Sequence, residues 1–270
     1  MPSLYVVATP IGNLEDISLR AIRILREVNL IAAEDTRRTK RLLNACSIKT
    51  PLTSYYEHNK LTKLEYILSR LEKEDVAIVS DAGMPGISDP GYELITAAIE
   101  KGIPVVPVPG PSAVITALAI SGLPADRYLY LGFLPSREVE RKRLLASVAQ
   151  EAGTIVVFEA PHRMTKALGS IIEVLGDRRL AICRQLTKLH EEVFRGKASQ
   201  ALEHFKKPKG EFVLVIVGAE KQKKRLDDDV ISQLEGLRYK GAKAKESVAE
   251  IAEKTGISRK ELYQAWLKLP

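Results

Sequence analysis

Four short segments rich in glycine, proline and small polar residues are the parts of this chain best suited to hold a ligand. Each follows an apolar run, and they lie at residues 9–13, 34–37, 80–86 and 109–113. Glycine lets the backbone approach a bound molecule closely, and proline fixes the shape of a loop beforehand. Any one segment is equally typical of an ordinary tight turn. Four of them in one half of the chain favour a surface that binds a flat, polar, mostly uncharged cofactor through main-chain groups.

The sequence motifs of several other ligand classes are missing. No GxGxxG follows an apolar run and no GxxxxGK[ST] occurs, so neither a dinucleotide site nor a P-loop is indicated. GxSxG is absent as well, which removes the usual signal of a serine nucleophile. The four histidines lack the spacing of metal ligands, so we expect no metal site; they are His58, His162, His190 and His204.

The elements that must position these segments are predicted by apolar runs and helical periods. In the first half of the chain, short apolar strands alternate with amphipathic helices, the first of which Asp16 or Ser18 is placed to cap. Such strands are typical of a mostly parallel sheet covered on both faces, where ligands bind beyond the carboxyl ends of the strands. The expected strands span residues 4–8, 30–33, 76–80 and 103–108, and the expected helices 19–25, 62–71, 92–101 and 113–120.

A second α/β region is predicted after a linker at residues 122–126, and its strands need not all be parallel. Beyond it come a charged segment at 221–225 and a helix, a turn and another helix over 248–267. The elements expected in the second region are residues 128–133, 137–150, 154–158, 163–175, 180–184, 193–196 and 211–218. We therefore predict three domains: an N-terminal α/β domain at 1–121, a second α/β domain at 122–220 and a small helical domain at 221–270.

Composition and charge are those of a globular protein with a basic surplus. Of the 270 residues, 45% are hydrophobic and 28% are charged, and the formal net charge is +7. Twelve basic and eight acidic residues lie from position 221 onward, so this tail carries four of the seven surplus charges. A moderate basic surplus suits a polyanionic partner such as RNA without proving one.

Two further features indicate a cytoplasmic protein. Cys46 and Cys183 form no CxxC pair and follow no secretory segment, which is typical of free thiols in a reducing compartment. The uncharged stretch at residues 102–125 is interrupted by prolines at positions 104, 107, 109 and 111. It is therefore expected to form a strand, a loop and a helix, and not to cross a membrane.

Eight segments carry a specific resemblance, and together they span nearly all of residues 1–220. They are TPIGNLEDI (9–17), EDTR (34–37), SDAGMPGISDPG (80–91), VPGPSA (108–113), GFLP (132–135), FEAPHR (158–163), RQLTKLHE (184–191) and GEFVLVIVG (210–218). In this order they resemble the tetrapyrrole methylase superfamily and, within it, the ribosomal RNA small subunit methyltransferase I family. The resemblance implies a class III methyltransferase fold, with two α/β domains and a cofactor cleft between them, followed here by a small helix-turn-helix-like domain.

The same resemblance implies a reaction. Members of that family use S-adenosylmethionine to methylate the 2′-oxygen of a cytidine ribose in the decoding region of 16S ribosomal RNA, and they are commonly dimers. Relatives that act on tetrapyrroles carry a glycine-rich first loop, whereas this chain has Ala8, Thr9 and Pro10, which favours the RNA branch. Gln185 stands where an acidic residue is expected in that branch, so this position offers no charge.

Carried over by motif, the resemblance assigns cofactor contacts to both halves of the chain. Asp81 is expected to accept a hydrogen bond from a ribose hydroxyl or from the methionine amine, or else to cap a turn. The implied cofactor-binding residues are Pro10, Asp81, Ala82, Gly83, Met84, Ser112, Ala113, Glu159, Ala160, Leu186, Phe212 and Val213.

Catalysis of this kind needs positioning first, then a proton acceptor or a cation for the poorly nucleophilic ribose hydroxyl. The candidates are Glu34, Arg37 and Lys188, with His190 and Glu191 nearby in the sequence. Glu34 and Asp35 follow a buried strand directly, where a carboxylate can equally cap the next helix. Lys188 and His190 can equally lie on a solvated edge.

Clusters of basic residues are the candidates for RNA contact, although single charge runs are more often solvated faces. Phosphate contacts of this kind weaken as the salt concentration rises. The residues expected to contact RNA are Arg38, Lys40, Arg41, Arg141, Arg163 and His190.

The tail has the spacing of a helix-turn-helix, with a turn at Gly256 and a capping box of Ser258 and Glu261. Such a module can dock on nucleic acid, or it can be a small bundle that merely packs or dimerises. Two other readings of the whole chain stay open: an enzyme of the same fold that acts on a corrinoid or porphyrinoid, and a regulator that binds nucleic acid.

Overall fold

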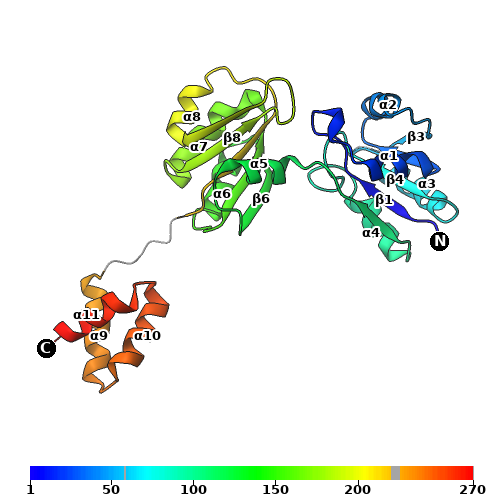
Figure 1. Ribbon diagram of the computed structural model, residues 1–270. Helices are drawn as coiled ribbons and strands as arrows, with labels where there is room; N and C mark the ends of the chain where they lie inside the picture. Colours follow the sequence, from blue (N-terminus) through cyan, green and yellow to red (C-terminus); the bar gives the residue numbers. More distant parts are fainter. Residues whose placement is uncertain (58, 220–225, 270) are drawn as a thin grey trace. The chain divides into compact units, whose positions relative to one another are not determined.

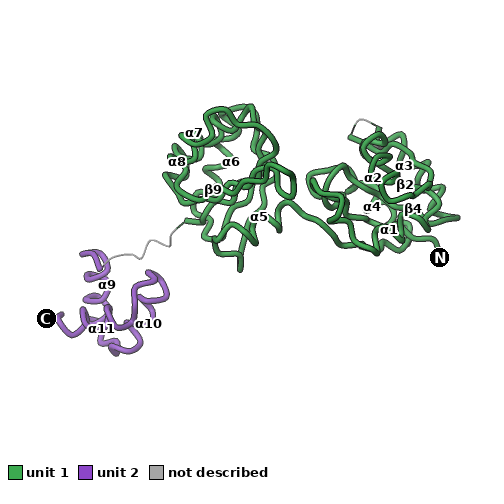
Figure 2. The backbone as a smooth tube through the Cα atoms, turned by 45° about the horizontal axis from the view of Figure 1, so that its top comes forward, with its two compact units in different colours: residues 1–219 green, residues 220–270 purple. Residues whose placement is uncertain are grey.

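The computed structural model describes residues 1–57, 59–219 and 226–269. It divides into two compact units, residues 1–219 and 220–270 (Figure 2). Unit 1 contains two five-stranded sheets, and unit 2 is helical (Figure 1). The charged segment at residues 221–225, which the sequence suggests as a hinge before the tail, lies outside the described residues.

The first sheet is parallel throughout, as the apolar runs predicted. Its strands lie in the order β3-β2-β4-β1-β5, and every pair is parallel. The two central strands with continuous burial, β2 and β4, are covered on both faces. The strands are β1 (Leu4–Val7), β2 (Leu30–Ala33), β3 (Leu52–Ser54), β4 (Val76–Val79) and β5 (Val105–Val108).

Four helices cover this sheet, two on each face. The helices α3 and α4 bury apolar residues against one face, and α1 and α2 against the other. Ser18, one of the two predicted caps, accepts a hydrogen bond from the Ala21 N–H and so begins α1. These helices are α1 (Leu19–Glu27), α2 (Thr36–Ala45), α3 (Lys60–Leu71) and α4 (Tyr92–Glu100).

The second sheet is mixed and has the order β6-β7-β10-β8-β9. Only β6 and β7 pair in parallel, and the three other pairs are antiparallel. Three helices cover one face: α6 (Glu138–Ser147), α7 (Met164–Leu175) and α8 (Ala198–His204). The strands are β6 (Tyr128–Phe133), β7 (Thr154–Glu159), β8 (Arg179–Arg184), β9 (Glu192–Lys197) and β10 (Phe212–Ile216).

The helix α5 (Ala113–Ser121) follows the first sheet in the chain but packs against the second. Its Val114, Ala117 and Leu118 join a core cluster with residues of β7, β8 and β10. Arg195 on β9 donates hydrogen bonds to the carbonyl oxygens of Ser121 and Ile120, which satisfies the carboxyl end of α5. The loop that precedes α5 therefore joins the two sheets.

Over its described residues 226–269, unit 2 is a bundle of three helices with its own core, made of α9 (Asp228–Tyr239), α10 (Ala244–Thr255) and α11 (Arg259–Lys268). Gly256, with φ of +72°, turns the chain between α10 and α11. Ser258 accepts a hydrogen bond from the Glu261 N–H at 3.2 Å and caps α11, which is one of the two hydrogen bonds of the predicted capping box. Within the described residues, no helix is both long and apolar enough to span a membrane.

Candidate functional site

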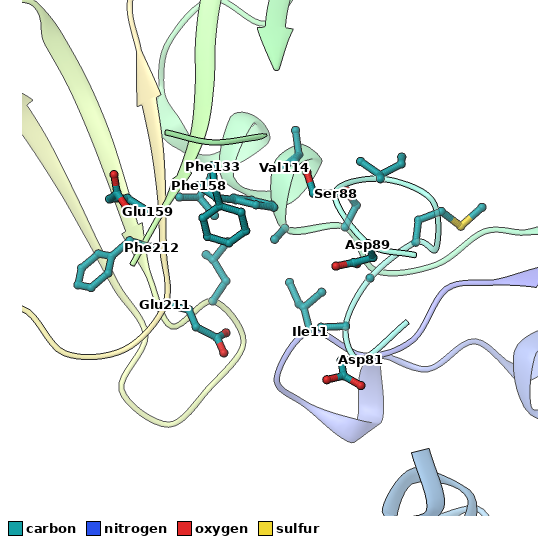
Figure 3. Close-up of a pocket in the computed structure, with 18 of the residues that line it drawn as sticks. Ile11, Asp81, Ser88, Asp89, Val114, Phe133, Phe158, Glu159, Glu211 and Phe212 are labelled. Carbon is teal, nitrogen blue, oxygen red and sulfur yellow. The ribbon is translucent and has the colours of Figure 1, made fainter. Parts of the chain in front are cut away.

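A cavity of about 410 Å³ opens between the loops of the first sheet and the second sheet (Figure 3). The loops after β1, β2 and β4 and the start of α5 form one side, and residues of β6, β7, β8 and β10 form the other. Eleven of the twelve residues expected to bind the cofactor line it. They are Asp81, Ala82, Gly83, Met84, Ser112, Ala113, Glu159, Ala160, Leu186, Phe212 and Val213.

The first-sheet loops are fastened to one another by backbone contacts. Thr9 and Gly83 exchange two hydrogen bonds, of 2.9 Å and 3.0 Å, and the Thr9 hydroxyl donates to the Ser80 carbonyl at 3.0 Å. At Gly110, a Cβ would lie 3.1 Å from the Cβ of Ala8, so the third loop also approaches closely. Residues 9–13, 80–86 and 109–113 therefore converge on one crevice, as expected of loops that follow the strands of a parallel sheet.

Glu34 and Asp81 are held side by side at the cavity through the backbone. The Asp81 N–H donates to Oε2 of Glu34 at 3.1 Å, and the Asp35 N–H donates to Oδ1 of Asp81 at 3.1 Å. Arg38 pairs with the other oxygen of Asp81 at 3.1 Å. The helix-capping role falls to Asp35, which accepts from the Arg37 N–H. Glu34 is thereby left to line the cavity, together with Arg38.

Asp89 is a third carboxylate in this part of the cavity. Burial raises its pKa to about 7, and the negative charges of Glu34 and Asp81 add to that rise. Burial also raises the pKa values of Glu34 and Asp81. Figure 3 shows Asp81 and Asp89 on the same side of the cavity. The sequence does not assign Asp89 to the site, although this residue lies in segment 80–91, which carries the family resemblance.

The opposite wall is mainly apolar. Leu186, Phe212 and Val213 are buried there, and burial raises the pKa of the Cys183 thiol to about 11, so this side chain stays neutral. Glu159 is buried too, but its carboxylate accepts from the Ala160 N–H and pairs with Arg163 at 2.8 Å. Its side chain is therefore engaged within the protein.

The loop of residues 185–191 packs against the loop of residues 9–13 and so connects the two sides of the cavity. Gln185 and Thr187 both have left-handed backbones, with φ of 51° and 65°. A Cβ at Gly12 would lie 2.5 Å from Cγ of Lys188, so only glycine lets the first loop pack here. Lys188 does not line the cavity; its ammonium pairs at 2.7 Å with Glu211, which does.

Comparison with known proteins identifies the architecture and the family. The family Tetrapyrrole (Corrin/Porphyrin) Methylases matches residues 3–202. Ribosomal RNA small subunit methyltransferase I of Thermotoga maritima is 53% identical over 223 residues, which are 82% of this chain and all of that protein. The protein of the same name from Halalkalibacterium halodurans is 42% identical over 272 residues, covering 98% of this chain and 94% of that one.

The chain belongs to the ribosomal RNA small subunit methyltransferase I family. The solved structure of the methyltransferase CobJ shares the fold, with a TM-score of 0.63 and 16% identity over 84% of this chain and 98% of that one. The predicted α/β fold of the tetrapyrrole-methylase type is confirmed. No cluster of histidine, cysteine, aspartate and glutamate suited to a metal ion occurs in the described part of this family member.

Three of the residues predicted to bind the cofactor or to take part in catalysis in this family member do not line the cavity. Pro10 is replaced in the lining by its neighbour Ile11. Arg37 is directed elsewhere: its guanidinium pairs with Asp35 at 3.0 Å, and its side chain is 88% exposed. Lys188 contacts the lining residue Glu211 but does not line the cavity itself. We therefore no longer expect Arg37 to meet the reacting atoms.

The prediction that Arg141 contacts RNA is wrong. Its side chain is buried, with 3% exposure, because it ties α6 to α7 and to the preceding loop. Nε donates to the Ser170 hydroxyl at 3.0 Å, and Nη1 donates to the carbonyl oxygens of Pro135 and Ser136 at 3.2 Å and 3.1 Å. A guanidinium engaged in this way has no face left for a phosphate.

Arg141→Ala is accordingly expected to destabilise the family member by about 2–4 kcal/mol, because buried acceptors would lose their donor and a cavity would open. Arg143 lies two residues further along α6 and is exposed, so Arg143→Ala should change the free energy of unfolding by less than about 0.5 kcal/mol. Urea denaturation of both variants measures the difference. Equal stability of the two would show that the buried network contributes nothing.

Proposed function

We propose that this chain transfers the methyl group of S-adenosylmethionine to the 2′-hydroxyl of a cytidine ribose in the decoding region of 16S ribosomal RNA, in the cytoplasm. The observation that carries the proposal is the cavity itself, which combines apolar walls with a set of carboxylates. The names of the relatives support the RNA substrate.

The residues of the cavity fit S-adenosylmethionine. That cofactor carries positive charge on its sulfonium and its ammonium groups, and its volume suits a cavity in the usual range of about 300–1,000 Å³. Among the described residues, Arg38 is the one lysine or arginine in the lining. The same lining contains five acidic residues, Glu34, Asp81, Asp89, Glu159 and Glu211.

Each side of the cavity has a distinct task in this proposal. Asp81 and Asp89 are positioned to attract a cation, and the buried Leu186, Phe212 and Val213 supply apolar surface for the adenosine portion. The bound cofactor supplies an electrophilic methyl group whose positive charge is lost on transfer. Glu34 is the candidate proton acceptor for the ribose hydroxyl, since its raised pKa makes it a stronger base than a free carboxylate.

A basic surface next to the cavity is suited to the RNA backbone. The helix α2 presents Arg37, Lys40 and the exposed Arg41, and a second hollow beside it is lined by Arg37, Lys40 and Lys49. None of the described residues lining that hollow is acidic. The basic residues suited to phosphate contact are therefore separate from the acidic cavity. Arg38, on the same helix, lines the cavity wall. His190 is exposed and is retained as a candidate contact, whereas Arg163 is already paired.

Removal of residues 220–270 is expected to leave the affinity for S-adenosylmethionine within about twofold and to weaken binding to the small ribosomal subunit about tenfold. The whole cavity belongs to unit 1, and the Thermotoga maritima relative aligns in full over 223 residues, close to the length of that unit. The tail adds basic charge that RNA attracts. Calorimetry and filter binding measure the two affinities. Loss of cofactor binding on truncation would contradict this division of labour.

The proposal is tested by incubating the full chain with S-adenosylmethionine carrying a labelled methyl group. Small ribosomal subunits from a strain without this methyltransferase serve as one acceptor, and a precorrin-type tetrapyrrole as the other. Label is expected in 16S ribosomal RNA alone. Label in the tetrapyrrole alone would establish the small-molecule reaction of the same fold, and the absence of cofactor binding with RNA present would favour a regulator.

A further inference from the structure

We infer that Phe133 is the stacking platform for the nucleobase of the target nucleotide, placed at the mouth of the cavity by a β-bulge in β6. The inference rests on the proposed function and names how this cavity holds the RNA.

An extra residue in β6 turns Phe133 toward the cavity. Tyr130 of β6 pairs with Val156 of β7. Two residues further along β7, Phe158 pairs with Phe133, where a regular strand would place Gly132. Three steps along β6 thus match two along β7, which is a bulge, and bulges are uncommon between parallel strands. Gly132 supplies the left-handed backbone that the bulge needs, with φ of +68°.

The core on the far side of the sheet shows what the bulge changes. Leu131 and Leu134 both pack into the core cluster beneath α6 and α7, although they are three positions apart in the sequence. In a regular strand, residues on the same face are two or four positions apart. Tyr130 and Phe133 are left on the cavity face, also three apart. Without the bulge, Gly132 would occupy the cavity position, and the Phe133 ring would point into the core.

Phe133 is positioned firmly although much of it is open to solvent. Its ring makes an edge contact with Phe158, at 5.4 Å between centroids, and Phe158 makes a second such contact with Tyr130. The Tyr130 hydroxyl bonds to the Ser88 hydroxyl at 2.7 Å, which connects the platform to the loop after β4. A Cβ at Gly132 would lie 3.3 Å from that Ser88 oxygen, so glycine also makes room for this link.

Phe133 lies at the entrance to the cavity and not in its interior, because much of its side chain is exposed to solvent. It is 55% exposed, and Ile87 at 52% is the one other large apolar residue in the described lining that is more than half exposed. Figure 3 shows Phe133 beside Phe158, on the side opposite Asp81 and Asp89. Phe212, Leu186 and Val213 provide buried apolar surface for the cofactor.

An exposed aromatic ring at this entrance suits an unstacked base. A ribose that reaches the cavity must come from a polymer outside it, so its base is left at the entrance. Proteins that bind single-stranded RNA commonly stack such bases on phenylalanine or tyrosine. Stacking also tolerates any base, so Phe133 would hold the nucleotide without selecting cytosine.

The test compares three full-length variants with the wild type. Phe133→Ala removes the ring, Phe133→Tyr keeps an aromatic ring, and Val139→Ala is the matched control, since Val139 lies on α6, is 72% exposed and does not line the cavity. Methyl transfer to small ribosomal subunits lacking the modification gives KM and kcat. Calorimetry gives the Kd for S-adenosylmethionine alone.

Phe133→Ala is expected to raise KM for the subunit about tenfold to a hundredfold, the usual effect of removing one stacking ring. Phe133→Tyr and Val139→Ala should stay near the wild type, and the cofactor Kd should change by less than about twofold in all variants. Unchanged KM in Phe133→Ala would overturn the inference. A cofactor Kd that rises as much as KM would also overturn it, because the ring would then belong to the adenine site. Failure of the wild type to bind cofactor would instead refute the proposed function.

Discussion

Ser112→Tyr is expected to lower the affinity for S-adenosylmethionine at least about a hundredfold, the largest effect that we expect of any single substitution. Ser112 lines the cavity and begins α5, where its hydroxyl accepts from the Ile115 N–H at 3.5 Å. A phenol ring at this position would project into the space that the cofactor needs. The close-packed residues around the cavity leave no room for the ring to move aside. Calorimetry with the purified full-length variant measures the loss.

Loss of the helix cap is a separate effect of that substitution, and Ser112→Ala isolates it. Removal of a serine cap costs about 1 kcal/mol of stability, but alanine leaves the cavity open. Both variants should therefore unfold at similar temperatures, whereas Ser112→Ala should bind cofactor within about threefold of the wild type. If Ser112→Tyr bound as well as Ser112→Ala, the cofactor would have to lie elsewhere.

Asp89→Asn is expected to weaken cofactor binding about tenfold to a hundredfold at pH 8, because a cation would lose a partly buried negative partner. The wild type should show a matching pH dependence. The pKa of Asp89 is raised to about 7, so the side chain is mostly neutral at pH 6 and mostly anionic at pH 8. Only the anion attracts the cofactor, so affinity should rise about tenfold between these pH values.

The comparison of pH profiles separates Asp89 from other titrating groups, including the amine of the cofactor itself. Asp89→Asn should flatten the rise between pH 6 and pH 8, since asparagine does not titrate in this range. Asp126, exposed in the linker, provides the control: Asp126→Asn should keep both the affinity and the profile of the wild type. An unchanged profile in Asp89→Asn would show that another group governs the pH dependence.

The local pattern of apolar residues was sufficient to predict most of the fold. The runs at β1, β2 and β4 are continuous because these strands are buried on both faces, which is why the sequence indicated a parallel sheet. No bounds were predicted for α2, β3, α8 and α9, and α2 was expected only as the helix that Glu34 or Asp35 would cap. β3 and α8 have only three and seven residues, too few to show a period, and α9 begins shortly after the charged segment at residues 221–225.

Contacts between distant residues explain what the sequence could not show. The pKa of Asp89 depends first on its burial and then on the charge of Glu34, which comes close only when the loops after β2 and β4 meet. Arg141 belongs to a charged run that resembles a solvated face, and only the fold places Ser170 against it. Likewise, nothing local indicates that α5 packs on the sheet that follows it.

Nucleoside mass spectrometry of 16S ribosomal RNA tests the central claim most directly. Small subunits without the modification are incubated with S-adenosylmethionine and either the wild type or Ser112→Tyr, then digested to nucleosides. One new 2′-O-methylcytidine per subunit is expected with the wild type, and none with the variant. A methyl group on a base, or equal amounts of 2′-O-methylcytidine from both proteins, would contradict it.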